Sequence, residues 1–152
     1  MRYTYQNYAS ISPHDMSDAM RLNSWKTGVE IIKRNFWTGV GVGDLQNECV
    51  KVSRELFPEI TNDDDRKMPH NEFIWIWAAT GVFGFAAYCI AFLLPFIAYA
   101  RRSNWLFVVF YIIFFSSFMT EPALEEQVGT AFYLLFLLIF LNYFNYQPAA
   151  GE

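Results

Sequence analysis

Apolar positions follow one pattern in the first half of the chain and another in the second half. From Leu22 to Ile32, apolar residues recur at the spacing of one helix face, with charged residues on the other face. We therefore predict an amphipathic helix that begins at Ser17 or Asp18, either of which can cap it, and ends near Arg34. The residues up to about Pro13 show no helical period and are expected to form an irregular lead-in.

A second amphipathic helix is predicted between Asp44, which can cap its first turn, and Pro58, whose ring cannot continue a helix. Because apolar residues recur at helical spacing in this segment, one face of the helix is expected to be buried. The residues of this face are Leu45, Cys49, Val52 and Leu56.

Three glycines, at positions 39, 41 and 43, lie in the segment that joins the two helices. Their spacing is similar to that of a phosphate-binding loop, but no strand-helix-strand pattern surrounds them and no Lys followed by Ser or Thr comes after them. We therefore expect the glycines to supply turn positions of positive φ, which other residues adopt rarely.

The second half of the chain contains three uncharged apolar segments. The first extends from Phe73 to Ala100, which is longer than the roughly 20 residues that a helix needs to cross a bilayer. We predict three transmembrane helices, at about 73–100, 105–120 and 128–144. A stripe of small residues along the first of them predicts close contact with another helix. The stripe consists of Thr80, Gly84, Ala87 and Ala91.

Positive charge in the short loops decides the predicted orientation. Arg101 and Arg102 stand between the first two apolar segments, and basic loops of this kind face the cytoplasm. Residues 1–72 are then expected to be periplasmic in a bacterium, and residues 145–152 to form a cytoplasmic tail. Since the first residues lack the apolar core of a signal peptide, we expect the chain to be the C-terminal part of a larger membrane protein. The predicted fold class is all-α: a polytopic membrane protein fragment with a helical periplasmic loop domain followed by three transmembrane helices.

Charge is concentrated in the polar half, because nine of the 11 Lys and Arg residues and 11 of the 15 Asp and Glu residues lie at or before Glu72. No basic stripe with interleaved aromatic residues predicts a nucleic-acid partner. The run from Thr61 to Lys67 is expected to be solvated, and its three consecutive Asp side chains do not converge on one metal ion. Cys49 and Cys89 are expected on different sides of the membrane boundary and therefore unpaired. We expect no metal and no cofactor.

His70 stands where the polar half meets the first apolar segment. An imidazole titrates close to neutral pH, so it can accept a proton from a hydroxyl group at the membrane surface. Glu72 is a second candidate base, although an exposed carboxylate is a weaker base at neutral pH. The alternative is that His70 only ends a loop.

Arg21 lies in the first turn of the first predicted helix, beside Trp25 at the edge of the apolar stripe. Two interpretations remain open. The aliphatic part of the side chain can lie along an apolar surface while the guanidinium reaches water, or the guanidinium can hold a phosphate together with the free backbone N–H groups of that turn. We predict that Arg21 lies close to His70 and that both side chains face one cavity. Such a pair would suit a lipid-linked diphosphate donor, with the arginine holding the leaving group and the histidine activating the acceptor.

Four stretches, in a characteristic order, carry a resemblance to a known family. They are Arg21-Leu22-Asn23-Ser24-Trp25 with Gly28 and Ile32, residues 35–43, His70-Asn71-Glu72-Phe73 running into Thr80-Gly81, and Glu121 to Phe132 with Glu125, Gln127 and Gly129. In these stretches the chain resembles the O-antigen ligase and polymerase-like membrane glycosyltransferases. The resemblance covers the chain from about Arg21 to Phe144, and it rests on the order and spacing of the motifs as well as on their residues.

The resemblance implies a transferase that moves a glycan from undecaprenyl diphosphate to a hydroxyl of lipid A-core oligosaccharide, with inversion and without a metal. In such ligases an arginine of the large periplasmic loop contacts the diphosphate, and a histidine before a late transmembrane helix acts in catalysis. These residues match Arg21 and His70, with Trp25, Asn71 and Glu72 as supporting residues. The implied partners, at the bacterial inner membrane, are the lipid-linked oligosaccharide donor, the glycan acceptor, membrane lipids and earlier helices of the same protein.

Other functions remain open from the sequence. A polysaccharide polymerase or a protein O-oligosaccharyltransferase would use the same donor and similar motifs with a different acceptor. The chain departs from the family in lacking the earlier helices and a further periplasmic arginine, so an inactive membrane fragment is a third possibility. A transporter is disfavoured, because no charged residue lies inside the predicted spans to form an ion pathway.

Overall fold

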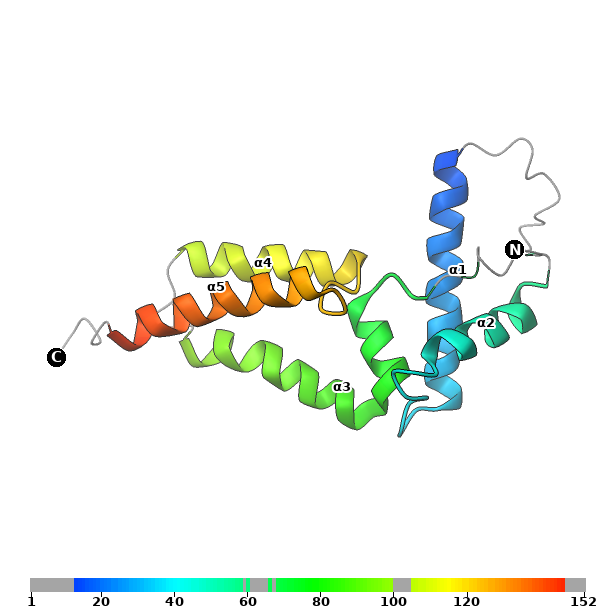
Figure 1. Ribbon diagram of the computed structural model, residues 1–152, viewed down its shortest axis with the longest axis horizontal. Coiled ribbons are helices and arrows are strands. Elements are labelled where there is room, and N and C mark those ends of the chain that lie inside the picture. The colour runs from blue at the N-terminus through cyan, green and yellow to red at the C-terminus, as the bar shows by residue number, and fades with distance from the viewer. Residues whose placement is uncertain (1–12, 59, 61–65, 67, 100–104, 147–152) are drawn as a thin grey trace.

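The computed structural model describes residues 13–58, 60, 66, 68–99 and 105–146, and within these ranges the chain forms five α-helices and no strand. The all-helical prediction is therefore confirmed for this part of the chain (Figure 1). The predicted lead-in of residues 1–12, the Arg101-Arg102 loop and residues 147–152 lie outside the described residues. The helices are α1 (Pro13–Arg34), α2 (Leu45–Leu56), α3 (Glu72–Tyr99), α4 (Trp105–Thr120) and α5 (Gln127–Tyr146).

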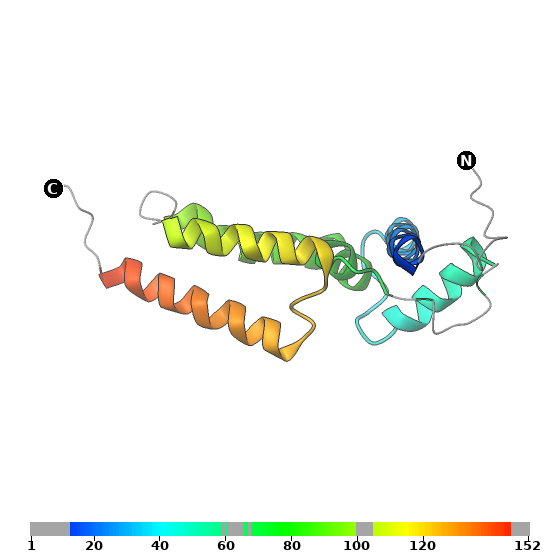
Figure 2. The same cartoon turned by 90° about the horizontal axis from the view of Figure 1, so that it is seen from above.

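The helices lie in two directions. α4, α5 and the later part of α3 run side by side along the length of the molecule, and α1 crosses the end of this group at a steep angle (Figure 1). In the view of Figure 2, α1 is seen nearly end-on while the other group lies in the plane of the picture. α1 packs against both α2 and α3, and α3 packs against α4. α1 thus connects α2 to the apolar helices.

The starts of the first two helices differ from the prediction. α1 begins at Pro13, so the prediction of a cap at Ser17 or Asp18 is wrong. Proline suits a first helical turn, because its fixed φ is helical and its missing N–H would have no partner there. At α2, Asp44 occupies the capping position, but its side chain makes no capping hydrogen bond.

The buried face of α2 is shorter than predicted. Leu45, Cys49 and Val52 are buried as expected, but Leu56 is 40% exposed. Ser53 is buried in addition, because it faces Arg66, which donates a hydrogen bond of 3.1 Å to its hydroxyl oxygen. Near the end of α2, the polar contact of Ser53 with Arg66 therefore takes the place of the apolar contact that was predicted at Leu56.

α3 is broken inside the predicted first span. Gly81 has φ 70° and ψ −173°, which is not helical, and the helix bends there (Figure 1). A break leaves backbone groups without helical partners, and in a membrane these must be satisfied by other protein groups. The segment joining α1 and α2 supplies them. Its hydrogen bonds run from Val40 N to Ala78 O (3.0 Å), from Gly41 N to Ala79 O (2.8 Å) and from Val82 N to Phe36 O (3.0 Å).

The glycines make this backbone contact possible. Gly39 and Gly41 have positive φ as predicted, whereas Gly43 does not. A Cβ on Gly39 would lie 2.4 Å from the carbonyl oxygen of Ala79, and a Cβ on Gly81 would lie 2.3 Å from that of Trp37. No side chain fits at either of these positions, so glycine at both lets the backbone of the joining segment lie directly against the backbone at the break in α3.

The three apolar helices share a core made mainly of aromatic rings. α3 is long and apolar enough to cross a membrane, and so is residue range 127–144 of α5, whereas α4 is apolar but shorter. No described helix covers the small-residue stripe at Ala87 and Ala91, which are exposed, so its close packing stays a prediction. Rings make the helix contacts because each buries a large area and stacks on its neighbours. The core consists of Phe92, Phe107, Phe110, Tyr111, Phe114, Phe118, Tyr133, Leu137 and Phe144.

Candidate functional site

Three segments of the chain meet at the carboxylate of Glu121. Arg21, from α1, places Nη2 at 3.6 Å from Oε1 of this carboxylate. His70, from the segment before α3, places Nδ1 at 3.0 Å from Oε2. Glu121 itself directly follows α4. The predicted proximity of Arg21 and His70 is therefore observed, and the carboxylate between them was not among the predicted site residues.

The backbone of His70 is held by α1. The indole Nε1 of Trp25 donates a hydrogen bond of 3.1 Å to the His70 carbonyl oxygen. α1 comes this close because of Gly28, where a Cβ would lie 2.7 Å from Cγ of Pro69 and 2.4 Å from Cγ2 of Ile74. The contact of Trp25 with the protein backbone makes it a residue that positions His70.

Asn71 and Glu72 tie the start of α3 to the end of α4. Asn71 caps α3, because its Oδ1 accepts a hydrogen bond of 3.1 Å from the N–H of Ile74, while its Nδ2 donates one of 3.1 Å to the Met119 carbonyl. Oε2 of Glu72 accepts a hydrogen bond of 3.0 Å from the N–H of Leu124. Glu72 is only 1% exposed, so the prediction that it is an exposed carboxylate is wrong. The fold has turned it inward to hold the α4–α5 loop.

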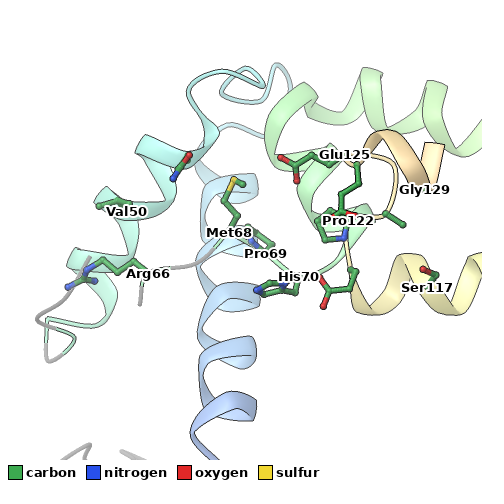
Figure 3. Close-up of a pocket in the computed structure, with 13 residues that line it drawn as sticks. Val50, Arg66, Met68, Pro69, His70, Ser117, Pro122, Glu125 and Gly129 are labelled. Atoms are coloured by element: carbon green, nitrogen blue, oxygen red, sulfur yellow. Dashed lines mark hydrogen bonds and ion pairs between the residues drawn. The ribbon is translucent and has the colours of Figure 1, made fainter. Parts of the chain in front are cut away.

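A cavity of about 660 Å³ lies beside His70, between α2 and the α4–α5 loop (Figure 3). This volume lies within the roughly 300–1,000 Å³ of small-molecule sites. Arg21 does not line the cavity, so the expectation that both site residues face it holds only for His70. The lining contains both signs of charge. Its polar side chains are Gln46, Arg66, His70, Ser117, Glu121, Glu125 and Glu126.

Arg66 is a second arginine at the site, and it belongs to the charge run that was predicted to be solvated. That prediction is wrong for this residue, which is 8% exposed and lines the cavity. Besides its bond to Ser53, its Nη1 donates to the Phe57 carbonyl at 3.4 Å and its Nη2 donates to the Ile60 carbonyl. Arg66 therefore fastens the chain after α2 to the end of that helix, across the cavity from the α4–α5 loop (Figure 3).

Glu121 and Arg66 were missed for different reasons. Glu121 follows an apolar helix at the end that lies on the same side as His70, and this placement was a usable signal. For Arg66 the neighbouring residues carry charge throughout, and nothing in that pattern separates a buried arginine from exposed ones. Among the described residues, no group of three or more His, Cys, Asp and Glu side chains is arranged to hold a metal ion.

The arrangement offers two chemical capacities. The guanidinium of Arg21 is half exposed and can hold an anion, and the imidazole of His70 is partly exposed beside the cavity and can exchange a proton. Glu121 touches both groups and links them. The site thus combines an anion-binding group and an acid–base group at one end of the apolar helices.

A family model described as O-antigen ligase matches residues 1–89, which is more than half of the chain. The matched range includes α1, α2, His70 and the break in α3, while Glu121 lies beyond it. No curated protein and no solved structure matches the chain.

Proposed function

The chain belongs to the O-antigen ligase family, and on that premise we propose that it acts in a membrane glycosyltransferase that moves a glycan from undecaprenyl diphosphate to a hydroxyl of lipid A-core oligosaccharide. The observation that carries this proposal is the meeting of Arg21 and His70 at one carboxylate beside a cavity of about 660 Å³. A diphosphate donor needs a cation for its leaving group, and the acceptor hydroxyl needs a base.

In the proposed reaction Arg21 acts on the lipid-linked donor and His70 acts on the acceptor. Arg21 binds the diphosphate through parallel N–H groups. His70 takes the proton of the acceptor hydroxyl as that oxygen bonds to the anomeric carbon. The bond between this carbon and the diphosphate oxygen breaks, and its electron pair leaves with undecaprenyl diphosphate. One displacement of this kind inverts the anomeric configuration.

The proposed membrane arrangement has α3, α4 and α5 as three spans of a bacterial inner membrane, residues 1–72 in the periplasm and residues 145–152 in the cytoplasm. The length of α3 and α5 supports two spans. α4 has 16 residues and requires a thin or locally adapted bilayer, but it shares the aromatic core of the other two. α1 would then lie along the membrane surface, since it crosses the apolar helices steeply (Figure 1).

Cysteine labelling of intact cells tests this arrangement. In a background without Cys49 and Cys89, cysteines at Glu48 and Glu125 are expected to react with an impermeant maleimide, and a cysteine at Arg101 to react only after the membrane is opened. Labelling at position 101 in intact cells contradicts the orientation.

Transfer of glycan from a defined lipid-linked donor, in membranes containing the protein, tests the function. His70→Ala is expected to lower the rate about 10² to 10⁴-fold with donor binding largely kept. Arg21→Lys is expected to weaken both donor affinity and rate, because an ammonium does not reproduce the planar two-pronged contact. Lys26→Ala, which removes an exposed charge from the same helix, is the control.

The same assay separates the alternatives. Offering lipid A-core, a growing glycan or a protein as acceptor distinguishes a ligase from a polymerase or a protein glycosyltransferase. Glu72→Gln is expected to be tolerated, because an amide oxygen still accepts the Leu124 N–H. Loss of transfer in Glu72→Gln together with retained transfer in His70→Ala would refute the assigned roles.

A further inference from the structure

We propose that Glu121 is a positioning residue with two functions: it orients the imidazole of His70, and it occupies Arg21 until a diphosphate replaces it. The proposal rests on the proposed function and adds a residue to it. Glu121 lies outside the range that the family model matches. Its two carboxylate oxygens divide between the two partners, with Oε2 at His70 and Oε1 at Arg21.

The contact with His70 selects one state of the ring. Nδ1 lies 3.0 Å from Oε2, which is a hydrogen-bond distance, and the carboxylate can only accept. Nδ1 therefore carries the proton, and the lone pair that can take a proton from an acceptor is on Nε2. Trp25 holds the carbonyl of the same residue, so α1 fixes the backbone of His70 while Glu121 fixes its ring.

The contact with Arg21 is weaker and exchangeable. Nη2 and Oε1 are 3.6 Å apart, beyond the 2.7–2.9 Å of a charge-assisted hydrogen bond. Both side chains are about half exposed, at 49% and 53%, so water competes for the pair. A diphosphate offers several oxygens and more charge to the guanidinium. Diphosphate binding would therefore release Arg21 from Glu121 and leave the carboxylate to His70.

The backbone around Glu121 is fastened from α3. Its own N–H donates to the Ser117 carbonyl at 2.9 Å, which continues the last turn of α4. On one side of it Asn71 holds the Met119 carbonyl, and on the other side Glu72 holds the N–H of Leu124. Two consecutive residues next to His70 thus bracket the carboxylate that His70 contacts. This gives Asn71 and Glu72 their supporting function.

Opposite changes in two kinetic constants test the proposal. In Glu121→Gln, kcat for transfer is expected to fall at least tenfold, because the neutral amide no longer selects the Nδ1–H state. The KM for the lipid-linked donor is expected to fall severalfold, because Arg21 loses its competing carboxylate. Glu121→Asp, which keeps the charge, should recover part of kcat. If Glu121 were needed only for folding, its substitution would lower kcat while KM rose or stayed unchanged, and that result overturns the proposal. An unchanged kcat overturns it as well.

Two measurements do not depend on transfer and therefore separate this proposal from the proposed function. Binding of inorganic pyrophosphate, followed by calorimetry, should be tighter in Glu121→Gln than in the unchanged protein and should be lost in Arg21→Gln. Glu48→Gln, which removes the same charge from α2 outside the cavity, should change neither binding nor transfer. If pyrophosphate binding is not tighter in Glu121→Gln, the exchange at Arg21 is refuted.

The ring state of His70 can be read directly. The chain has only two histidines, so ¹⁵N-histidine NMR of a His14→Gln variant reports on His70 alone. In the neutral ring we expect a protonated Nδ1 and an unprotonated Nε2, and a shift toward the other tautomer in Glu121→Gln. The same tautomer in both proteins overturns the orienting function. If the unsubstituted protein transfers no glycan while the pyrophosphate binding and the His70 tautomer behave as expected, that outcome refutes the proposed function but supports the positioning function of Glu121.

Discussion

The region of α1 and α2 and the region of the three apolar helices are packed on different principles. Around α1 and α2 the buried apolar side chains are small or aliphatic, and backbones approach so closely that Gly39 and Gly81 have no room for a Cβ. Among α3, α4 and α5 most buried side chains are rings, and large residues on the outer faces, such as Phe83 at 71% and Leu138 at 62%, stay exposed. The core of the first region consists of Ile31, Leu45, Cys49, Val52, Ala78 and Ala79.

The difference shows which helix must be held at a fixed position for the site to form. Backbone contacts hold α1 at a fixed place on α3, and α1 carries Arg21 and Trp25 to His70. Rings pack with more tolerance of angle, and helices in lipid gain little from burying apolar area against one another. Glu121 comes from the second region, so the site depends on both kinds of packing where they meet.

The largest effect is expected in the glycine segment. Gly39→Ala should cost at least about 3 kcal/mol of stability, because it combines a left-handed residue with a collision against the Ala79 carbonyl. Gly41→Ala has a positive φ but open space, so it should cost only about 1–2 kcal/mol. Gly43→Ala, with neither feature, should be close to neutral. Unfolding in detergent measures the series, and equal costs for Gly39→Ala and Gly41→Ala would disprove the matched backbone contact.

The same substitution made in both regions compares their packing directly. Leu45→Ala, at a fully buried position on α2, should cost about 2–5 kcal/mol through lost burial and a cavity. Leu137→Ala, in the core of the apolar helices, should cost about 1 kcal/mol, because only contacts between helices are lost in an apolar surrounding. Unfolding of the protein in bilayers is the measurement. A larger cost for Leu137→Ala would contradict the contrast between the regions.

Asn71 ties the start of α3 to the end of α4, and its two hydrogen bonds can be separated. Asn71→Ala loses both and should cost about 1–2 kcal/mol. Asn71→Asp keeps an acceptor for Ile74 but places a carboxylate against the Met119 carbonyl, so it should move the loop that carries Glu121. We expect Asn71→Asp to lower transfer more than Asn71→Ala lowers it, relative to the stability that each loses. If the two variants lose transfer in proportion to the stability that they lose, Asn71 does not act on transfer through the loop that carries Glu121.

The smallest effect is expected from thiol reagents, which should leave the fold unchanged. Cys49 is 1% exposed, and burial raises the pKa of its thiol to about 12. Because the thiolate is the reactive form, a raised pKa keeps the thiol protonated and unreactive at neutral pH. A water-soluble maleimide should therefore modify Cys49 only after denaturation, as mass spectrometry can show. Rapid modification of Cys49 in the folded protein would mean that α2 leaves α1 readily.

Local patterns predicted much of this architecture. Helical spacing identified α1 and α2, and uncharged length identified α3, α4 and α5, with ends that differ by a few residues. The start of α1 was placed too late, because capping side chains at Ser17 and Asp18 gave a stronger signal than a proline in a first turn. The candidates His70 and Arg21 followed from their places in those elements, and their roles remain proposals.

Periodicity and composition depend only on neighbouring residues, so the sequence by itself determined the helices, the apolar segments and the position of His70 at their boundary. The tertiary structure alone decided that Glu121 meets Arg21 and His70, that Glu72 and Arg66 are buried, and that the break at Gly81 is filled by the segment before α2. Each of these features joins segments separated in the chain, most of them by tens of residues. A side chain's partners and its exposure are set by where those segments fold, and no local pattern contains that information.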